Sequence, residues 1–434
     1  MKTVSSFALA MALGAGALAA AQPAMAQRAP GATQQRPDAS KKEQAQQQQA
    51  PVEATAGGRK FKFSKEARNA IAALQAAQAS PDPAAFPAAL AAAQALAQNS
   101  DDRYAIAQLQ LAQAIKANSD DQKIVAIDAL IRSGGATAEE LPKLHNSIGG
   151  LHYNAKRYPE AATAFQKVIE LSPTYPGAAN NLAASLAQQN NPAGAAAVLE
   201  QRIAAAKAAN QPVPQDLYKQ ALALAYQAKS PKSIALSREI AAAYPTPENW
   251  RTAIAIYRQL KKPAGDVNLD ALRLQRALKG IDNRDDYLLL AYFLERGSFY
   301  AEARSVIEEG FASGKVQRGN SDATQILGAV TPKIAADRAA LPGLEARARA
   351  GANGTLALRL AEGYFGHGDH AKAAEFYRVA VQKGGVDSIL ANSRLGIALA
   401  LAGQRAEAET AFKAVTGPRQ ELASYWLLWL SQRA

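Results

Sequence analysis

Four histidines are the first side chains to weigh for chemistry, because imidazole serves both as a metal ligand and as a general base. Two of them, His367 and His370, stand in "FGHGDHAKA" with Asp369 between them and Glu362 upstream. These are donor types of a metal site, but such a site needs three or four ligands in fixed geometry. The glycines beside these histidines place the stretch in a loose turn between helices. We therefore expect no metal here.

Other reactive groups are sparse. The chain has no cysteine, which excludes thiol chemistry, disulfides and Cys-ligated zinc. It also lacks a G-x-S-x-G elbow, an H-E-x-x-H pair and a Gly-rich phosphate loop. Adjacent carboxylates stand near expected helix starts, where they complement the helix dipole, at Asp101-Asp102, Asp120-Asp121, Glu139-Glu140 and Asp285-Asp286. We expect no catalytic residue and no cofactor, although a glycosidase pair assembled in space stays open.

The N-terminus has the pattern of a secretory signal peptide. Lys2 precedes a short apolar run, and Ala24-Met25-Ala26 is a small-residue cleavage signal, so residues 1–26 are predicted to be removed. The absence of cysteine excludes a lipoprotein anchor, and the expected location is the periplasm. Residues 27–60 are rich in Gln, Ala and Pro and are predicted to be a disordered arm.

The chain is basic. Its formal net charge is +12, and losing Lys2 with the signal peptide leaves +11. In the periplasm such a surface would meet an acidic glycan, an anionic membrane surface or an acidic protein rather than nucleic acid, or it would only aid solubility. The stretch from 251 to 279, with seven Lys/Arg against two Asp, is one candidate site for an acidic partner.

Helical patterns fill the chain from about residue 61, and one spacing recurs in them. Leu or Ile is followed by Gly or Ala, then by a large residue three positions later, an Ala twelve positions later and often a second large residue. Six frames agree: Ile148, Gly149, His152, Ala161 and Phe165; Leu182, Ala183, Leu186, Ala195 and Leu199; Leu222, Ala223, Tyr226 and Ala235; Leu290, Ala291, Leu294, Ala303 and Ile307; Leu360, Ala361, Tyr364, Ala373 and Tyr377; and Leu395, Gly396, Leu399, Ala408 and Phe412. The small residues let two antiparallel helices approach closely, and the large ones fill the groove beside that contact. His145 and His152 fall in the first and third large columns of one repeat, so both are expected to pack.

These columns resemble the tetratricopeptide repeat, a helix-turn-helix unit of about 34 residues. The family pattern is carried here by Ile148, Gly149, His152, Tyr158, Ala161, Phe165, Val168 and Pro173. The resemblance implies an all-α fold, a right-handed superhelical solenoid of antiparallel helix pairs, in a tetratricopeptide protein of the bacterial periplasmic type.

The array is not uniform along the chain. Residues 61–140 read as divergent helical pairs, and 141–418 as the repeat array, with degenerate units near 250–280 and 320–350. Asp266 occupies an alanine column in the first of these, and Pro332 and Pro342 are expected to break the second. Residues 419–434 are predicted to be a capping helix whose Trp426 and Trp429 cover the last repeat.

The resemblance also implies a polar groove lined by the first helix of each pair. Its columns fall on Lys143, Asn146, Tyr153, Asn180, Asn181, Gln188, Gln220, Gln227, Arg251, Arg258, Tyr292, Arg359, Phe365 and Arg394. Such side chains can hold an extended peptide, or simply be solvated. Only Asn181 matches the arrangement with which related domains hold a C-terminal carboxylate.

The sequence thus predicts a non-catalytic scaffold that binds proteins of the cell envelope. Two alternatives stay open: an accessory protein of exopolysaccharide secretion, binding an acidic polymer or its synthase, and a glycan-cleaving enzyme on a helical solenoid. The sequence leaves the oligomeric state open.

Overall fold

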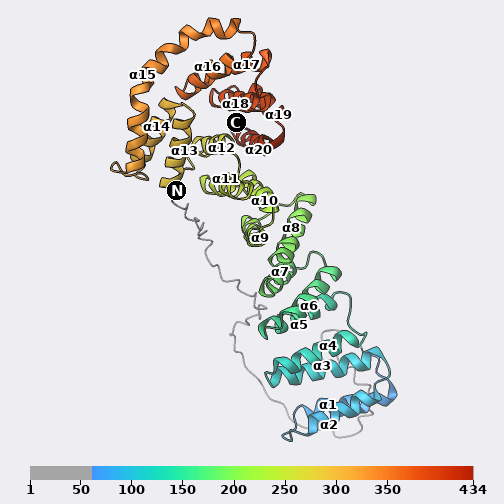
Figure 1. Cartoon of the computed structure of the whole chain (residues 1–434). Helices are drawn as coiled ribbons and strands as arrows, with labels where there is room; N and C mark the ends of the chain where they lie inside the picture. The colour runs from blue at the N-terminus through green and yellow to red at the C-terminus, as the bar shows by residue number, and fades with distance from the viewer. Residues whose placement is uncertain (1–60, 434) are drawn as a thin grey trace, which may run out of the picture. The chain divides into compact units, whose positions relative to one another are not determined.

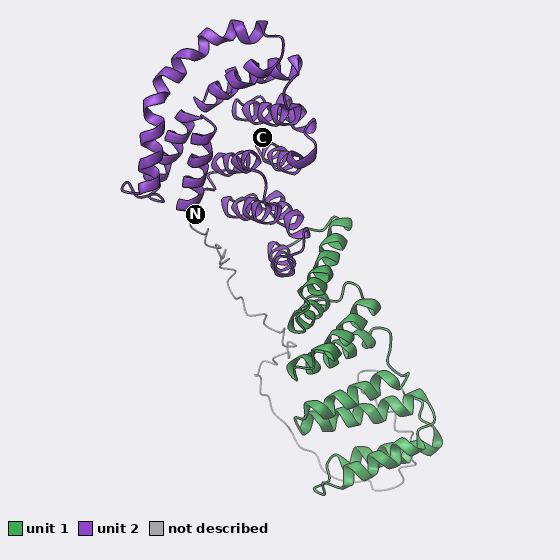
Figure 2. Cartoon of the chain, in the orientation of Figure 1, with its two compact units in different colours: residues 1–213 green, residues 214–434 purple. Residues whose placement is uncertain are grey.

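Helices account for nearly all regular structure in the computed structural model, which describes residues 61–433 (Figure 1). These residues form twenty α-helices, one short 3-10 helix and no strand. The predicted signal peptide and arm lie outside the described residues. The chain divides into two compact units, 1–213 and 214–434 (Figure 2).

The described part of unit 1 contains eight helices in four consecutive pairs. They are α1 (Lys65–Ala77), α2 (Ala85–Leu96), α3 (Ser100–Lys116), α4 (Asp120–Arg132), α5 (Glu140–Asn154), α6 (Tyr158–Leu171), α7 (Ala178–Gln188) and α8 (Pro192–Ala208). Several start at side-chain caps: Asn99 accepts from the backbone of Asp102 in a capping box, and Asn191 accepts from Gly194 before α8.

Unit 2 contains the remaining helices. They are α9 (Gln215–Gln227), α10 (Lys232–Ala243), α11 (Pro247–Lys261), α12 (Gly265–Ala277), α13 (Arg284–Arg296), α14 (Tyr300–Ala312), α15 (Ser321–Ala350), α16 (Thr355–Gly366), α17 (His370–Lys383), α18 (Ser388–Leu401), α19 (Arg405–Lys413), η1 (Gly417–Arg419) and α20 (Gln420–Ser431).

The recurring columns form the contacts between paired helices. A Cβ added to Gly149 of α5 would lie 2.8 Å from the ring of Phe165 on α6, and one on Gly396 of α18 would lie 2.7 Å from Phe412 on α19. Because real Cβ atoms do not approach that closely, these rings pack directly on bare helix backbone. Most of the other column residues are buried as well, namely Ile148, Ala161, Leu182, Ala195, Leu290, Ala303, Leu360, Tyr364, Ala373, Leu395 and Ala408, whereas His152, Leu186 and Tyr226 are partly buried. The fold is therefore a solenoid of antiparallel helix pairs.

One of the six frames does not match the packing at its two alanine columns, Ala223 and Ala235. Ala235 of α10 is exposed, whereas its neighbour Ile234 is buried, and on α9 the fully buried small residues are Ala221 and Ala225 rather than Ala223. The frame "Leu-Ala" matched in sequence but not in packing.

The expected break at Pro332 and Pro342 is also corrected. Both prolines lie inside α15, a single 30-residue helix where a helix pair was expected. Both are exposed. A proline removes one backbone donor and crowds the preceding turn, and on a solvent-facing side water can satisfy the carbonyl that is released.

Unit 2 closes on itself through its last helix. The ring of Trp426 on α20 stacks on Phe412 of α19 at 6.0 Å, which covers the end of the last pair. Another side of α20 packs on much earlier helices: the ring of Tyr425 lies 5.7 Å from that of Tyr257 on α11, and Gln432 accepts from Trp250 Nε1 at 3.0 Å. Within the described residues, no helix is long and apolar enough to span a membrane.

Candidate binding surface

Three first helices of unit 1 can be aligned by the residue that ends them. Asn118, Lys156 and Asn190 follow α3, α5 and α7, and each has a positive φ, of 49°, 60° and 56°. This left-handed residue reverses the chain into the second helix of each pair. Counting back from it gives the same helical position in all three helices.

The positions ten, six and three residues before that turn share one helix face. The first set is polar, with Gln108, Asn146 and Asn180; the second is small, with Ala112, Gly150 and Ala184; the third is Ile115, Tyr153 and Ala187. We call these nine residues the α3–α7 stripe. All are at least partly exposed, and Ile115 is 59% exposed although it is a large aliphatic side chain.

For two residues of the stripe, Gly150 and Asn146, contacts within the protein do not account for the residue type found there. A Cβ added to Gly150 would meet nothing within 4 Å, so this glycine is not required by packing, unlike its neighbour Gly149. The side-chain oxygen of Asn146 is buried yet accepts no hydrogen bond. A buried acceptor without a donor costs about 1–3 kcal/mol. The two residues lie one helical turn apart, at a place where a partner's backbone could approach and donate.

The other predicted groove residues of unit 1 lie on or beside the stripe. Lys143 is exposed one turn before Asn146, and the ring of Tyr153 packs edge-on against Tyr158 at 5.4 Å. Asn180 accepts from Arg202 at 2.6 Å. Asn181 is partly exposed and Gln188 exposed on α7.

In unit 2, four of the eight predicted groove residues are paired or buried, and the other four are exposed. Gln220, Gln227, Tyr292 and Arg359 are exposed. Arg251, in contrast, pairs with Asp282, and Arg258 donates to Asp286 at 2.7 Å. Phe365 and Arg394 are buried, which corrects their assignment to an open groove. Phe365 and Arg394 are buried because the C-terminal segment packs back onto the earlier helices of unit 2, so positions that would line an open groove lie in the interior of the unit.

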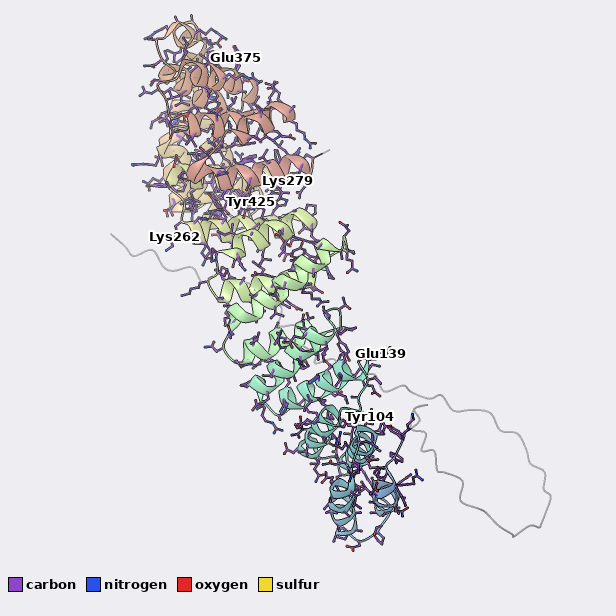
Figure 3. The ribbon with its side chains drawn as sticks, turned by 90° about the vertical axis from the view of Figure 1, so that its right-hand side faces the viewer. Tyr104, Glu139, Lys262, Lys279, Glu375 and Tyr425 are labelled. Carbon is purple, nitrogen blue, oxygen red and sulfur yellow. The ribbon has the colours of Figure 1, made fainter. Side chains whose placement is uncertain are left out.

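The basic stretch 251–279 is largely neutralised in the same way. Arg273 binds Glu302 and Asp270, and Arg276 donates to Glu309 at 2.8 Å. Lys262 and Lys279, labelled in Figure 3, remain exposed. The stretch is therefore mainly an internal ion-pair network rather than the acidic-partner site that the sequence suggested.

At the centre of that network lies a buried carboxylate. Asp270 of α12 is completely buried and accepts from Arg419 at 2.7 Å and from Arg273 at 3.1 Å, with Arg394 Nε 3.8 Å away. Burial opposes its charged form, but the charges of Arg394, Arg273 and Arg419 outweigh burial and hold the pKa of Asp270 below its ordinary value. The guanidinium of Arg273 lies between the rings of Phe299 and Phe365, 4.4 Å from each centroid.

His367 and His370 each have a pairing or packing partner. His367 Nε2 lies 2.8 Å from Asp337 of α15, and the ring of His370 packs edge-on against Phe365. Burial lowers the pKa of His370, and burial likewise lowers the pKa values of His145 and His152. Among residues 61–433 no group of three or more His, Cys, Asp or Glu side chains could hold a metal ion.

Sequence reasoning missed part of the stripe. Gly150 was passed over beside Gly149, and Ile115 and Gln108 lie in the divergent region where the repeat spacing is 38 residues rather than 34. The left-handed turn residues, Asn or Lys after Ala or Gln, were the signal that would have aligned these helices.

Comparisons with known proteins place few limits on this surface. No protein-family model matches the chain, and no curated protein matches it. Among solved structures, Naa15/Naa10 bound to HypK-THB resembles it with 13% identity and a TM-score of 0.35, over 78% of this chain. The chain spans just over half, 55%, of that protein. The yeast Sti1 TPR2AB domain in complex with pHSP90 is similar over 68% of this chain and 100% of that domain, with 13% identity and a TM-score of 0.24.

Proposed function

We propose that the protein is a non-catalytic scaffold of the bacterial cell envelope that binds an extended segment of a partner protein on the α3–α7 stripe. The observation that carries this proposal is the pairing of Asn146 and Gly150 on α5. One offers a buried, unused acceptor and the other an open stretch of helix backbone one turn away.

The chemistry of the stripe suits a peptide main chain. Side-chain amides such as those of Gln108, Asn146 and Asn180 can both donate to and accept from peptide groups, so they hold a backbone without demanding one sequence. The small column lets that backbone lie close to the helices, and Ile115 and Tyr153 offer apolar contact at its edge. Aromatic side chains with a polar tip are common anchors in such interfaces.

The periplasmic location in this proposal rests on the signal-peptide pattern at residues 1–26. An acidic polymer is the less favoured ligand. Its case depended on an open basic surface, and Arg251, Arg258, Arg273 and Arg276 are each engaged by a carboxylate.

Site-specific photocrosslinking tests the proposal. A benzophenone amino acid at position 153 or 115 of the protein in its native periplasm should crosslink one defined protein. The same probe at Gln166 or Thr163, exposed on α6, should not. The crosslink should still form when irradiation is carried out at high salt, whereas a polysaccharide held by charge would dissociate before it is captured.

A matched pair of glycine variants completes the design. Gly150→Gln should abolish the crosslink from position 153, because it fills the open space on the stripe. Gly328→Gln, at an equally open helical glycine of α15, should leave it unchanged. Crosslinks of equal yield from α5 and α6, or a yield insensitive to Gly150→Gln, would refute the proposed surface.

A further inference from the structure

A cavity of about 310 Å³ lies in unit 2, where the single helix α15 stands in the place of a helix pair. The first half of α15 packs on α13 and α14 through Ile326 and Val330. Its second half lies against α16, where a Cβ added to Gly363 would be 2.6 Å from the side chain of Leu341. Helix α15 bridges these two contacts in Figure 1. The cavity is the space left beside that bridge, lined by α15, α16 and residues 297–299.

Five of the side chains that line this cavity are apolar. Phe299, Leu341 and Leu360 are buried, and Leu344 and Leu356 are half-buried. A volume of this order holds one small organic molecule. Four leucines around it suit a branched aliphatic group, because such a group packs on their methyl groups without leaving a polar atom unpaired.

Three of the lining side chains are charged, and each has binding capacity left. Arg359 of α16 is exposed and has no hydrogen bond or ion pair with any other described residue. Oδ2 of Asp337 lies 2.8 Å from Nε2 of His367, and Oε1 of Glu362 accepts from Arg394. In the described part of the chain, the second oxygen of each carboxylate has no partner. The cavity therefore offers a free cation and two open carboxylate oxygens beside an aliphatic wall.

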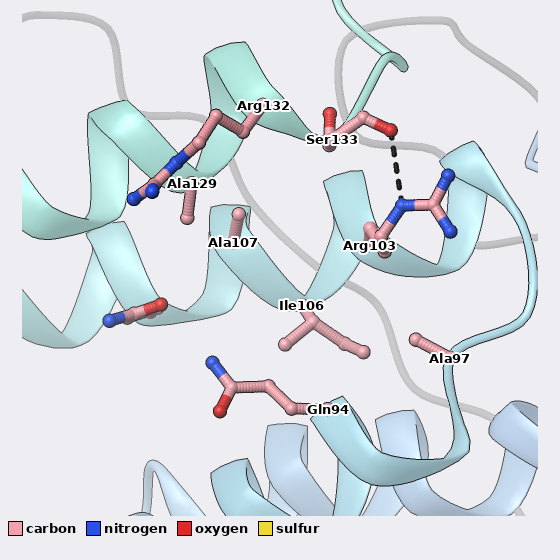
Figure 4. Close-up of a pocket in the computed structure, with 9 residues that line it drawn as sticks. Gln94, Ala97, Arg103, Ile106, Ala107, Ala129, Arg132 and Ser133 are labelled. Atoms are coloured by element: carbon pink, nitrogen blue, oxygen red, sulfur yellow. Dashed lines mark hydrogen bonds between the residues drawn. The ribbon is translucent and has the colours of Figure 1, made fainter.

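The cavity between α2, α3 and α4 of unit 1 differs in this respect (Figure 4). It measures about 260 Å³ and is lined by two arginines, but both are engaged. Arg103 donates Nε to the carbonyl of Ser133 at 3.3 Å, the bond drawn in Figure 4, and Arg132 pairs with Asp128. No acidic side chain of the described residues lines it. The combination of a free cation with open carboxylates is thus a property of the cavity in unit 2.

We infer that the cavity in unit 2 binds a free α-amino acid with a branched aliphatic side chain, of about the size of leucine. The guanidinium of Arg359 binds its carboxylate, and the open oxygens of Asp337 and Glu362 accept from its ammonium group. Its side chain packs on the four leucines. A zwitterion matches both signs of charge at once, whereas a ligand with one charge would leave either the arginine or the carboxylates without a partner. This site goes beyond the proposed function and does not depend on the α3–α7 stripe.

Isothermal titration calorimetry of the full-length protein with three matched ligands tests the inference. L-Leucine, 3-methylbutylamine and 4-methylpentanoic acid share one branched chain, but the amine lacks the carboxylate and the acid lacks the ammonium group. L-Leucine should bind at least about tenfold more tightly than either, because a hydrogen bond to a charged group contributes about that factor. No binding of L-leucine at millimolar concentrations would overturn the inference. Equally tight binding of the acid would overturn it too, and would assign the cavity to a carboxylate alone.

Two variants locate the charges of the site. Arg359→Gln should weaken the binding of L-leucine about tenfold or more, and the fold should be unaffected because this side chain is exposed and unpaired. Asp337→Asn should weaken L-leucine but not 4-methylpentanoic acid. The matched control is Arg347→Gln, at an exposed arginine of α15 outside the cavity, which should leave the affinity unchanged. Equal affinities of Arg359→Gln and Arg347→Gln for L-leucine would refute this site.

Discussion

Arg419, in the short helix before the last helix, donates Nη1 to Asp270 of α12 at 2.7 Å, although 149 residues separate the two in sequence. Both side chains are almost fully buried, and Arg273 and Arg394 complete the charge balance around the carboxylate. This contact joins α12, the fourth helix of unit 2, to the segment before its last helix, and makes that part of the unit a closed body rather than an open array.

Replacing Asp270 should therefore be among the most damaging single changes in unit 2. Asp270→Asn would leave three buried arginines short of one negative charge, and breaking a buried ion pair costs about 3–5 kcal/mol. Urea unfolding followed at unit 2 should report that loss. Arg405→Ala, which removes an exposed pair with Glu409, is the matched control and should change the unfolding free energy by at most about 0.5 kcal/mol. Equal effects would show that the network contributes no special stability.

Acid should weaken unit 2 through Asp286. Burial opposes its charged form, but Arg258 and hydrogen bonds from Asn283 and Gln275 outweigh burial and lower its pKa. A lowered pKa in the folded state contributes stability that is present above about 3.9, the pKa of an unfolded Asp, and is lost as pH falls through the folded value. Wild type should exceed Asp286→Asn in melting temperature at pH 7, and the gap should narrow below about pH 4. A gap that is constant from pH 7 to pH 2 would exclude this linkage.

The adjacent glycines of α5 should respond in opposite directions to alanine. Gly149→Ala forces a Cβ against Phe165, and such overpacking costs about 1–3 kcal/mol. Gly150→Ala enters open space, so it should gain up to about 1 kcal/mol from helix propensity. Thermal unfolding of the two variants decides the matter, and destabilisation by both would mean that Gly150 has a packing role.

Truncation of Trp426 should test the cover that α20 provides. This side chain is fully buried, stacks on Phe412 and meets Trp429 edge-on at 5.4 Å. Trp426→Ala should cost about 3–5 kcal/mol, as for other buried aromatic residues. Tyr292→Ala, at a ring that is 48% exposed, should stay within about 0.5 kcal/mol. Comparable losses would argue that α20 is loosely attached.

The periodic part of the architecture was predictable from sequence, and the closure was not. Helix pairs can be recognised from the spacing of Gly149 and Phe165, and of Gly396 and Phe412. The contact between each glycine and its ring is local, and the spacing recurs at intervals of 34 or 35 residues. Asp270, Arg394 and Arg419 carry no such period. Their pairing depends on how the C-terminal segment packs back onto α12, which the sequence pattern does not reveal. Arg394 was therefore predicted to line a groove although it is buried beside Asp270. Asp266 shows the same limit: it interrupts an alanine column, and the structure pairs it with Arg419.

The candidate site was predictable to a similar degree. The helix face that carries Asn146, Tyr153 and Asn180 followed from the repeat register. The open backbone at Gly150 and the unused oxygen of Asn146 did not, because both depend on what the neighbouring helices leave empty.

Closure of unit 2 also bears on how the chain is made. In an open repeat array each unit gains stability as soon as its neighbour exists, so structure can spread from any point. In unit 2, by contrast, the surface of α11 is covered by Tyr425 and the charge of Asp270 is balanced by Arg419 only after residues 419–434 have been made. During synthesis on a ribosome, unit 2 would remain unfinished until α20 emerges, and would then close in one cooperative step.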